Sequence, residues 1–212
     1  EIRLSLVGSE MCIRDRRNCV YVFEASSNRQ QPLTVIENVA PAQATLQGVI
    51  AHGERLAVLA RGENCTYLRI YSIAEPTKPV LLSAIEQSGA CVQAGLVGEN
   101  VYVLSHFVFD PKAEQSVPAL TVNGEIHRAL PEHIVRLAGA NQAQYTVLGT
   151  VNVQTGKAAE DVAAVLGGGP KVQLTKKAAY VGASGDADRT AYGVKWLSLI
   201  HISEPTRLRR IS

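Results

Sequence analysis

Long apolar runs and a large excess of one charge are both missing from this sequence. No stretch of its 212 residues approaches the roughly 18 apolar residues that a membrane-spanning helix needs. Lysine and arginine number 21 and the acidic residues 19, for a net charge of +2. This balance does not indicate a basic surface for nucleic acid or an anionic membrane. We therefore expect no nucleic-acid partner and no membrane segment.

Cysteines are few, and their spacing does not pair them. The chain has four, at Cys12, Cys19, Cys65 and Cys91, and Cys12 lies in a terminal segment that is set aside below. The other three are an odd number without C-x-x-C spacing, so neither a zinc site nor a self-contained disulfide framework is predicted. We interpret them as small buried strand residues. A Cys65–Cys91 disulfide in an exported protein is the alternative.

Motifs for nucleotide binding and hydrolysis are also missing. Residues 167–171 (Gly-Gly-Gly-Pro-Lys) and 155–157 (Thr-Gly-Lys) both lack the Gly-x-x-x-x-Gly-Lys-Ser/Thr spacing of a P-loop, and we interpret them as turns. Residues 182–185 lack the Gly-x-Ser-x-Gly spacing of a nucleophile elbow. No catalytic residue and no cofactor are predicted.

The two ends of the chain look like translated sequencing adapter. Residues 5–16 and 197–207 can be encoded by DNA strings that are reverse complements of each other over almost their whole length. We expect residues 1–16 and 197–212 to be artefacts, and residues 17–196 to be a partial domain with neither native terminus. Without the charged residues of those ends, the rest of the chain is neutral.

A seven-residue phrase that occurs twice organises the rest. Residues 53–59 (Gly-Glu-Arg-Leu-Ala-Val-Leu) return 45 residues later as residues 98–104 (Gly-Glu-Asn-Val-Tyr-Val-Leu). A turn followed by an apolar strand, repeated every 40 to 50 residues or so, is typical of β-propeller blades. Glycine accepts the positive φ at the first position of a type II′ turn, so each phrase predicts a tight hairpin.

The sequence around the first phrase predicts one complete four-stranded blade. Its strands are expected at residues 48–52, 55–60, 67–73 and 80–85. The strand after the glycine turn is apolar at nearly every position, as expected where neighbouring sheets cover both faces. Residues 19–24 and 33–36 repeat the outer hairpin, and we place them in the preceding blade.

The second phrase predicts another blade with an interruption. Its strands are expected at residues 91–96, 101–109, 145–153 and 157–166, and a further copy of the buried strand at 178–182. Residues 110–144 contain three prolines and little periodicity, so we interpret them as a loop insertion. The fold class predicted is all-β: a β-propeller fragment of roughly three four-stranded antiparallel blades, one with a long loop insertion.

Several phrases carry a family resemblance. They are residues 68–82, 98–104, 118–124, 130–132 and 151–168. They resemble bacterial secreted β-propeller domain proteins, which are distantly related to WD-repeat propellers. The resemblance implies an exported or surface-attached domain, and it carries over no catalytic residue. A secreted or cell-surface location is expected from the resemblance alone.

His127, His133 and Glu132 are the candidate functional residues, all within the insertion. Imidazole and carboxylate groups are common metal ligands, but this spacing matches no ligand motif, so no metal site is predicted. Asp186 and Asp188 are too few for a calcium site of six to eight oxygens or so.

The leading functional hypothesis is a non-catalytic interaction or ligand-binding domain, with the insertion contributing to one face, because loops on a rigid scaffold often carry binding. The alternative is part of a propeller enzyme of the dehydrogenase or hydrolase type, with its site in loops around the central channel. The expected partners are an unidentified protein or small ligand and the remaining blades of the same chain. Because a partial ring leaves strand edges unpaired, residues 17–196 expressed alone are expected to aggregate.

Overall fold

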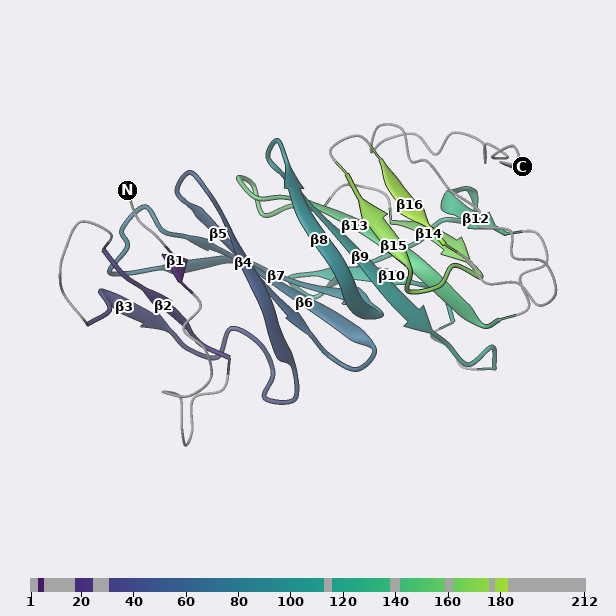
Figure 1. Ribbon diagram of the computed structural model, residues 1–212, viewed down its shortest axis with the longest axis horizontal. Coiled ribbons are helices and arrows are strands. Elements are labelled where there is room, and N and C mark those ends of the chain that lie inside the picture. Colours follow the sequence, from purple (N-terminus) through teal and green to yellow (C-terminus); the bar gives the residue numbers. More distant parts are fainter. Residues whose placement is uncertain are drawn as a thin grey trace, which may run out of the picture.

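The computed structural model describes residues 4–5, 18–24, 31–112, 116–137, 142–158, 162–175 and 178–182. In these residues the chain forms four β-sheets that follow one another in a row (Figure 1). We number them sheets 1 to 4 from the N-terminal end of the row. The prediction of an all-β chain built from successive sheets is confirmed.

Sheets 1 and 4, at the ends of the row, are small. Sheet 1 has the order β1 (Leu4–Ser5), β2 (Val20–Val22) and β3 (Thr34–Ile36), all antiparallel. Sheet 4 pairs β15 (Val172–Leu174) with β16 (Ala179–Val181). Both the predicted early hairpin and the predicted strand at 178–182 are therefore present.

Sheet 2 contains the predicted complete blade and two further strands. Its order is β4 (Thr45–His52), β5 (Arg55–Arg61), β6 (Cys65–Ser72), β7 (Val80–Ser88), β10 (Ala119–Val122) and β11 (Glu125–Arg128). The first four strands pair antiparallel in chain order, as predicted.

Sheet 3 follows the same plan. Its order is β8 (Ala90–Val97), β9 (Asn100–Val108), β13 (Gln144–Asn152), β14 (Ala163–Leu166) and β12 (Ile134–Arg136), the last running parallel to β14. The strand predicted at 157–166 is shorter than expected. Ala158 makes one isolated bridge with Val151, residues 159–161 lie outside the described part, and the strand begins at Ala163.

The hydrophobic cores lie between successive sheets. Residues 56–60 of β5 and 101–105 of β9 are buried at every position, because each of these strands has a sheet on both faces. One core joins sheet 1 to sheet 2, a second joins sheet 2 to sheet 3, and a third joins sheet 3 to sheet 4. This packing matches the prediction that neighbouring blades cover the strand after each glycine turn.

A type II′ turn connects the two strands of each inner hairpin, as predicted. Gly53 and Gly98 have φ of 57° and 61°, and the glutamate that follows each is not among the residues with positive φ. The inner strands also share an irregularity, because the register of β4 shifts at Gln47 and that of β8 at Val92. These bulges are 45 residues apart, the spacing of the sequence repeat.

The insertion differs from the predicted loop. It supplies β10 and β11 to the outer edge of sheet 2, then a 3-10 turn η1 (Pro131–His133), then β12 to the outer edge of sheet 3. The β10–β11 hairpin turns at Asn123 and Gly124, whose φ values of 49° and 92° fit a type I′ turn. The physical reason is edge pairing: the outer strands of both blades offer unpaired backbone groups, and the insertion satisfies part of them.

A buried glutamine joins sheets 2 and 3. Gln87 of β7 is 3% exposed, and its Nε2 donates to Ser105 Oγ at 2.8 Å and to the Val103 carbonyl at 3.1 Å. On the neighbouring β13, a Cβ at Gly149 would collide with the Gln87 side chain. The amide therefore fixes the contact between the two large sheets and requires glycine opposite it.

The cysteines match the interpretation as strand residues. Cys19 and Cys91 are buried and Cys65 is half-buried, and none of the three is in a disulfide. The alternative Cys65–Cys91 bridge is therefore not formed.

Among the described residues, no helix has the length and apolar character needed to cross a bilayer.

Candidate functional site

An open cavity of about 430 Å³ lies at the outer half of sheet 2, beside the end of β9. Ligand pockets in proteins are commonly of roughly 300 to 1,000 Å³, so this one has the size of a small-molecule or side-chain site. Its lining comes from β6, β7, β10, β11 and the chain segments that enter and leave the insertion. The insertion is therefore essential to the cavity.

Strand register builds one side of the cavity. Glu86 of β7, Thr121 of β10 and Ile126 of β11 are directly opposite one another across three strands. Arg128 is opposite Ala119, whose N–H donates to Ser88 Oγ at 3.0 Å. Side chains two residues apart in a strand share a face, so these two rows lie on the same face of sheet 2. The floor is therefore formed by the neighbouring strands β6, β7, β10 and β11.

The chain that leaves β9 forms the wall. Val108, Phe109 and Asp110 line the cavity, and Val117 lines it where the chain returns to β10. Asn64 Nδ2 donates to the Val108 carbonyl at 3.1 Å, which ties the wall to sheet 2.

An aromatic stack ties the same wall to sheet 3. The Phe109 ring stacks on Tyr145 with centroids 4.9 Å apart, and the Phe109 N–H donates to the Ala143 carbonyl at 3.1 Å. The wall is therefore attached to both large sheets, through Asn64 to sheet 2 and through Tyr145 to sheet 3.

The lining combines apolar and charged groups. Val108, Ile126 and Val117 are 55%, 54% and 39% exposed, unusually high values for large apolar side chains that lie close together. Glu86, Asp110 and Arg128 supply charges of both signs. Such a lining suits a ligand with an apolar body and a few polar or charged groups.

The Cys65 thiol in the cavity lining is not activated as a nucleophile by a lowered pKa. Burial, with a smaller contribution from Glu86, raises the pKa of the Cys65 thiol above its usual range. The thiol is therefore protonated at neutral pH, and a thiol is a much weaker nucleophile than a thiolate. No histidine is among the described residues that line the cavity. Among the described residues that line the cavity, the Cys65 thiol is therefore not paired with a histidine base.

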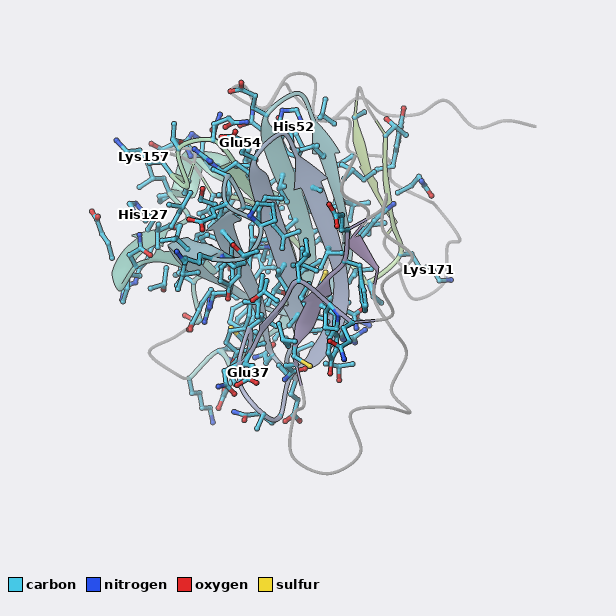
Figure 2. All side chains as sticks on the ribbon, turned by 90° about the vertical axis from the view of Figure 1, so that its left-hand side faces the viewer. Glu37, His52, Glu54, His127, Lys157 and Lys171 are labelled. Carbon is cyan, nitrogen blue, oxygen red and sulfur yellow. The ribbon has the colours of Figure 1, made fainter. Side chains whose placement is uncertain are left out.

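The residues singled out from the sequence lie elsewhere in the insertion. His127 is half-buried in β11, between Ile126 and Arg128, and its side chain points to the face opposite theirs. Figure 2 shows it on the outlying hairpin, far from His52 and Glu54 at the top of the view. Glu132 is exposed and His133 half-buried in η1. The described part of the chain has no group of three or more His, Cys, Asp or Glu arranged to hold a metal.

Asp186 and Asp188, the other carboxylates considered from the sequence, lie outside the described residues.

Sequence reasoning missed the residues that line the cavity. Glu86, Val108 and Arg128 are far apart along the chain, and only the return of the insertion to sheet 2 brings them together. The one available signal was Asn123-Gly124, because Asn-Gly between short β-prone runs is the strongest local indication of a hairpin.

A family of known proteins matches most of the chain. The family described as Beta propeller domain matches residues 4–210. No curated protein and no solved structure matches the chain. The family match runs through both terminal segments that the sequence analysis attributes to adapter, and that attribution stays a prediction.

Proposed function

Because this chain belongs to the β-propeller domain family, we propose that it is a non-catalytic binding domain whose ligand occupies the cavity between sheet 2 and the insertion. The observation that carries the proposal is the attachment of the cavity wall to two sheets. The segment that follows β9 is bonded to sheet 2 through Asn64 and stacked on sheet 3 through Tyr145. A surface fixed from two sides needs little ordering when a ligand binds.

The inner strands favour binding over catalysis. In a propeller the first strand of each blade lines the central channel, and the alternative function places an active site in the loops around that channel. Strands β4, β8 and β15 carry no Asp, Glu, Lys or Arg side chain, and His52 ends β4. General acid–base chemistry needs such groups within hydrogen-bond reach of the substrate. The described inner strands therefore lack these groups, whereas the turns that follow β4 and β8 carry Glu54 and Glu99.

An exported or surface-attached location in a bacterium is part of the proposal. Its support is the resemblance of the strand phrases to secreted propeller domains. If protease added to intact cells of the source organism digests the domain, the location is supported. If the domain is digested only after lysis, this part of the proposal is wrong.

A ligand screen tests the cavity. Amphipathic fragments are screened against the chain by amide chemical shifts, and binders should shift the amides of Glu86, Thr121 and Ile126. We expect Thr121→Trp, which fills the cavity, to weaken these binders by about tenfold or more. The matched control is Val92→Trp, at an exposed position of β8 in another sheet.

Two results would contradict the proposal. One is binding that Thr121→Trp leaves unchanged, because the ligand would then lie elsewhere. The other is a turnover of any substrate that His127→Ala together with His133→Ala abolishes, because the insertion would then be catalytic.

A further inference from the structure

We propose that the ligand of the cavity is an aliphatic carboxylate, whose charged head lies over Ala119 and whose apolar chain follows Val108, Val117 and Ile126. This inference rests on the proposed function, because it names the chemical class of the ligand for the same cavity. The class follows from which charged groups of the lining are free.

The observation that carries the inference is an arginine without a partner. Arg128 of β11 is exposed in the lining, and its guanidinium makes no ion pair or hydrogen bond with another residue of the described part of the chain. Its planar fork of N–H donors matches the oxygens of a carboxylate. A lining that leaves this fork free favours an anionic ligand.

The carboxylates of the described lining, Glu86 and Asp110, already have contacts. Glu86 Oε1 lies 3.7 Å from Arg69 Nη2, on the β6 side of β7 and therefore away from β10. Asp110 Oδ1 accepts from the Lys112 N–H at 2.9 Å and holds the turn at the start of the insertion. A cationic ligand would compete with Arg69 for Glu86, whereas an anionic ligand meets an unoccupied arginine.

Hydroxyl groups beside the arginine complete the site for the charged head. Ala119 is directly opposite Arg128, and on its other side its N–H donates to Ser88 Oγ at 3.0 Å. Thr121 follows on the same face of β10. Among the described residues, neither hydroxyl donates its hydrogen to a protein acceptor, so both can turn it towards a ligand. Neighbouring strands lie about 4.8 Å apart, so an anion over the small Ala119 side chain is within reach of all these donors.

Exposed apolar side chains of the same cavity accommodate the rest of the ligand. Val108, Ile126 and Val117 come from the wall and the floor, so an aliphatic chain placed between them removes apolar surface of both partners from water. The chain then supplies most of the affinity, and the charged head fixes the orientation. A free fatty acid and the C-terminus of an apolar peptide share this chemistry.

The experiment uses the full chain and octanoate, with octanol and octylammonium as probes of the same chain length and different head charge. Binding is followed through the amide chemical shifts of Glu86, Thr121 and Ile126. We expect octanoate to bind about tenfold more tightly than octanol, and octylammonium to bind most weakly. Acetyl-leucyl-leucine with a free carboxylate distinguishes the sources: tighter binding than octanoate identifies a peptide C-terminus, and weaker binding identifies a fatty acid.

Protein variants test the role of the arginine. Arg128→Gln keeps hydrogen-bond donors but removes the charge, so it should weaken octanoate by about tenfold and leave octanol unchanged. The matched control is Arg136→Gln, at an exposed arginine of β12 in sheet 3, which should change neither. Glu86→Gln removes a like charge from the lining and should tighten octanoate by about twofold.

Three results would overturn the inference. The first is equal binding of octanol and octanoate that Thr121→Trp weakens equally, since the cavity would then bind an uncharged ligand and the proposed function would stand. The second is tightest binding of octylammonium with a loss on Glu86→Gln, since the ligand would then be a cation. The third is octanoate binding that neither Thr121→Trp nor Arg128→Gln changes, which would contradict the proposed function as well.

Discussion

Sheets 2 and 3 are alike on their inner sides and different on their outer sides. Each begins with a bulged inner strand, a type II′ turn at Gly53 or Gly98, and a strand buried on both faces. Beyond the fourth strand they diverge, because sheet 2 gains an antiparallel hairpin and sheet 3 gains one short parallel strand.

The difference separates two kinds of constraint. The inner halves must pack against neighbours on both faces, so their turn, bulge and burial repeat together. The outer halves need only a satisfied edge, and one insertion satisfies each of them differently. The proposed binding cavity lies on the outer half of sheet 2, where the constraint is weaker.

The largest expected effect is at the junction between the two sheets. Gly89 has φ of 91°, and a Cβ there would lie 2.7 Å from the His106 backbone of β9. Neither backbone can move without breaking the β8–β9 ladder, so Gly89→Ala should lower the free energy of unfolding by about 4 kcal/mol. Urea denaturation followed by circular dichroism measures it. A loss no larger than that of Gly98→Ala would show that the junction is not tight.

Gln87→Leu should have the next largest effect. Leucine fills a similar volume, but it leaves the Val103 carbonyl and Ser105 Oγ without the donor that crosses between the sheets. We expect a loss of about 2 kcal/mol in the free energy of unfolding, measured in the same way. The control Gln173→Leu changes the same residue type on the exposed side of β15 and should be neutral. Equal losses for the two variants would remove any special role for Gln87.

Gly53→Ala and Gly98→Ala should be small and equal. Both glycines have positive φ, and an added Cβ meets nothing within 4 Å at Gly98 and only the Gln154 side chain, at 3.9 Å, at Gly53. The cost is then the backbone conformation alone, about 1 kcal/mol for each variant. Thermal unfolding of the two variants measures it. A difference well above the experimental error would show that the inner halves are not equivalent.

The smallest expected effect is a pH dependence of stability that arises in sheet 3 and has no counterpart at the matching position of sheet 2. Cys91 of sheet 3 occupies the place of Leu46 in sheet 2, and burial raises the pKa of its thiol from 9.0 to about 11, with Arg61 opposing. A raised pKa means that the folded state holds its proton longer than the unfolded state does. This contribution to stability is complete below pH 9 and is lost as the pH rises towards about 11.

Cys91→Ala tests that pH dependence. The free energy of unfolding is measured with urea at about pH 8 and about pH 10.5. The decrease between the two pH values should be smaller in the variant than in the parent chain. An identical loss in both would mean that the thiol does not titrate in this range.

The inner halves were predictable because their signals are local. A glycine turn, a strand that is apolar at every position and a constant spacing together identified both inner hairpins and the four-strand order. The predicted strand at 157–166 was too long, since the repeat was extended through residues whose helix propensity is high.

The outer half of sheet 2 was not predictable in the same way. Whether residues 119–128 pair with β7, with β14 or with nothing depends on which edge they reach through space. Asn123-Gly124 indicates a hairpin, but it does not indicate which sheet the hairpin joins. The cavity could not be predicted for the same reason, because Glu86, Val108 and Arg128 come together only after that pairing is made.

The route of the chain has a consequence for biosynthesis. Strands β4 to β7 of sheet 2 are complete once Ser88 has left the ribosome. The outer hairpin of sheet 2, β10 and β11, follows only after β8 and β9 of sheet 3. During that interval the apolar edge of β7 is open along its whole length, when nascent chains are most exposed to wrong pairing. Sheets 2 and 3 therefore mature together, and slow translation between residues 88 and 128 would prolong the vulnerable stage.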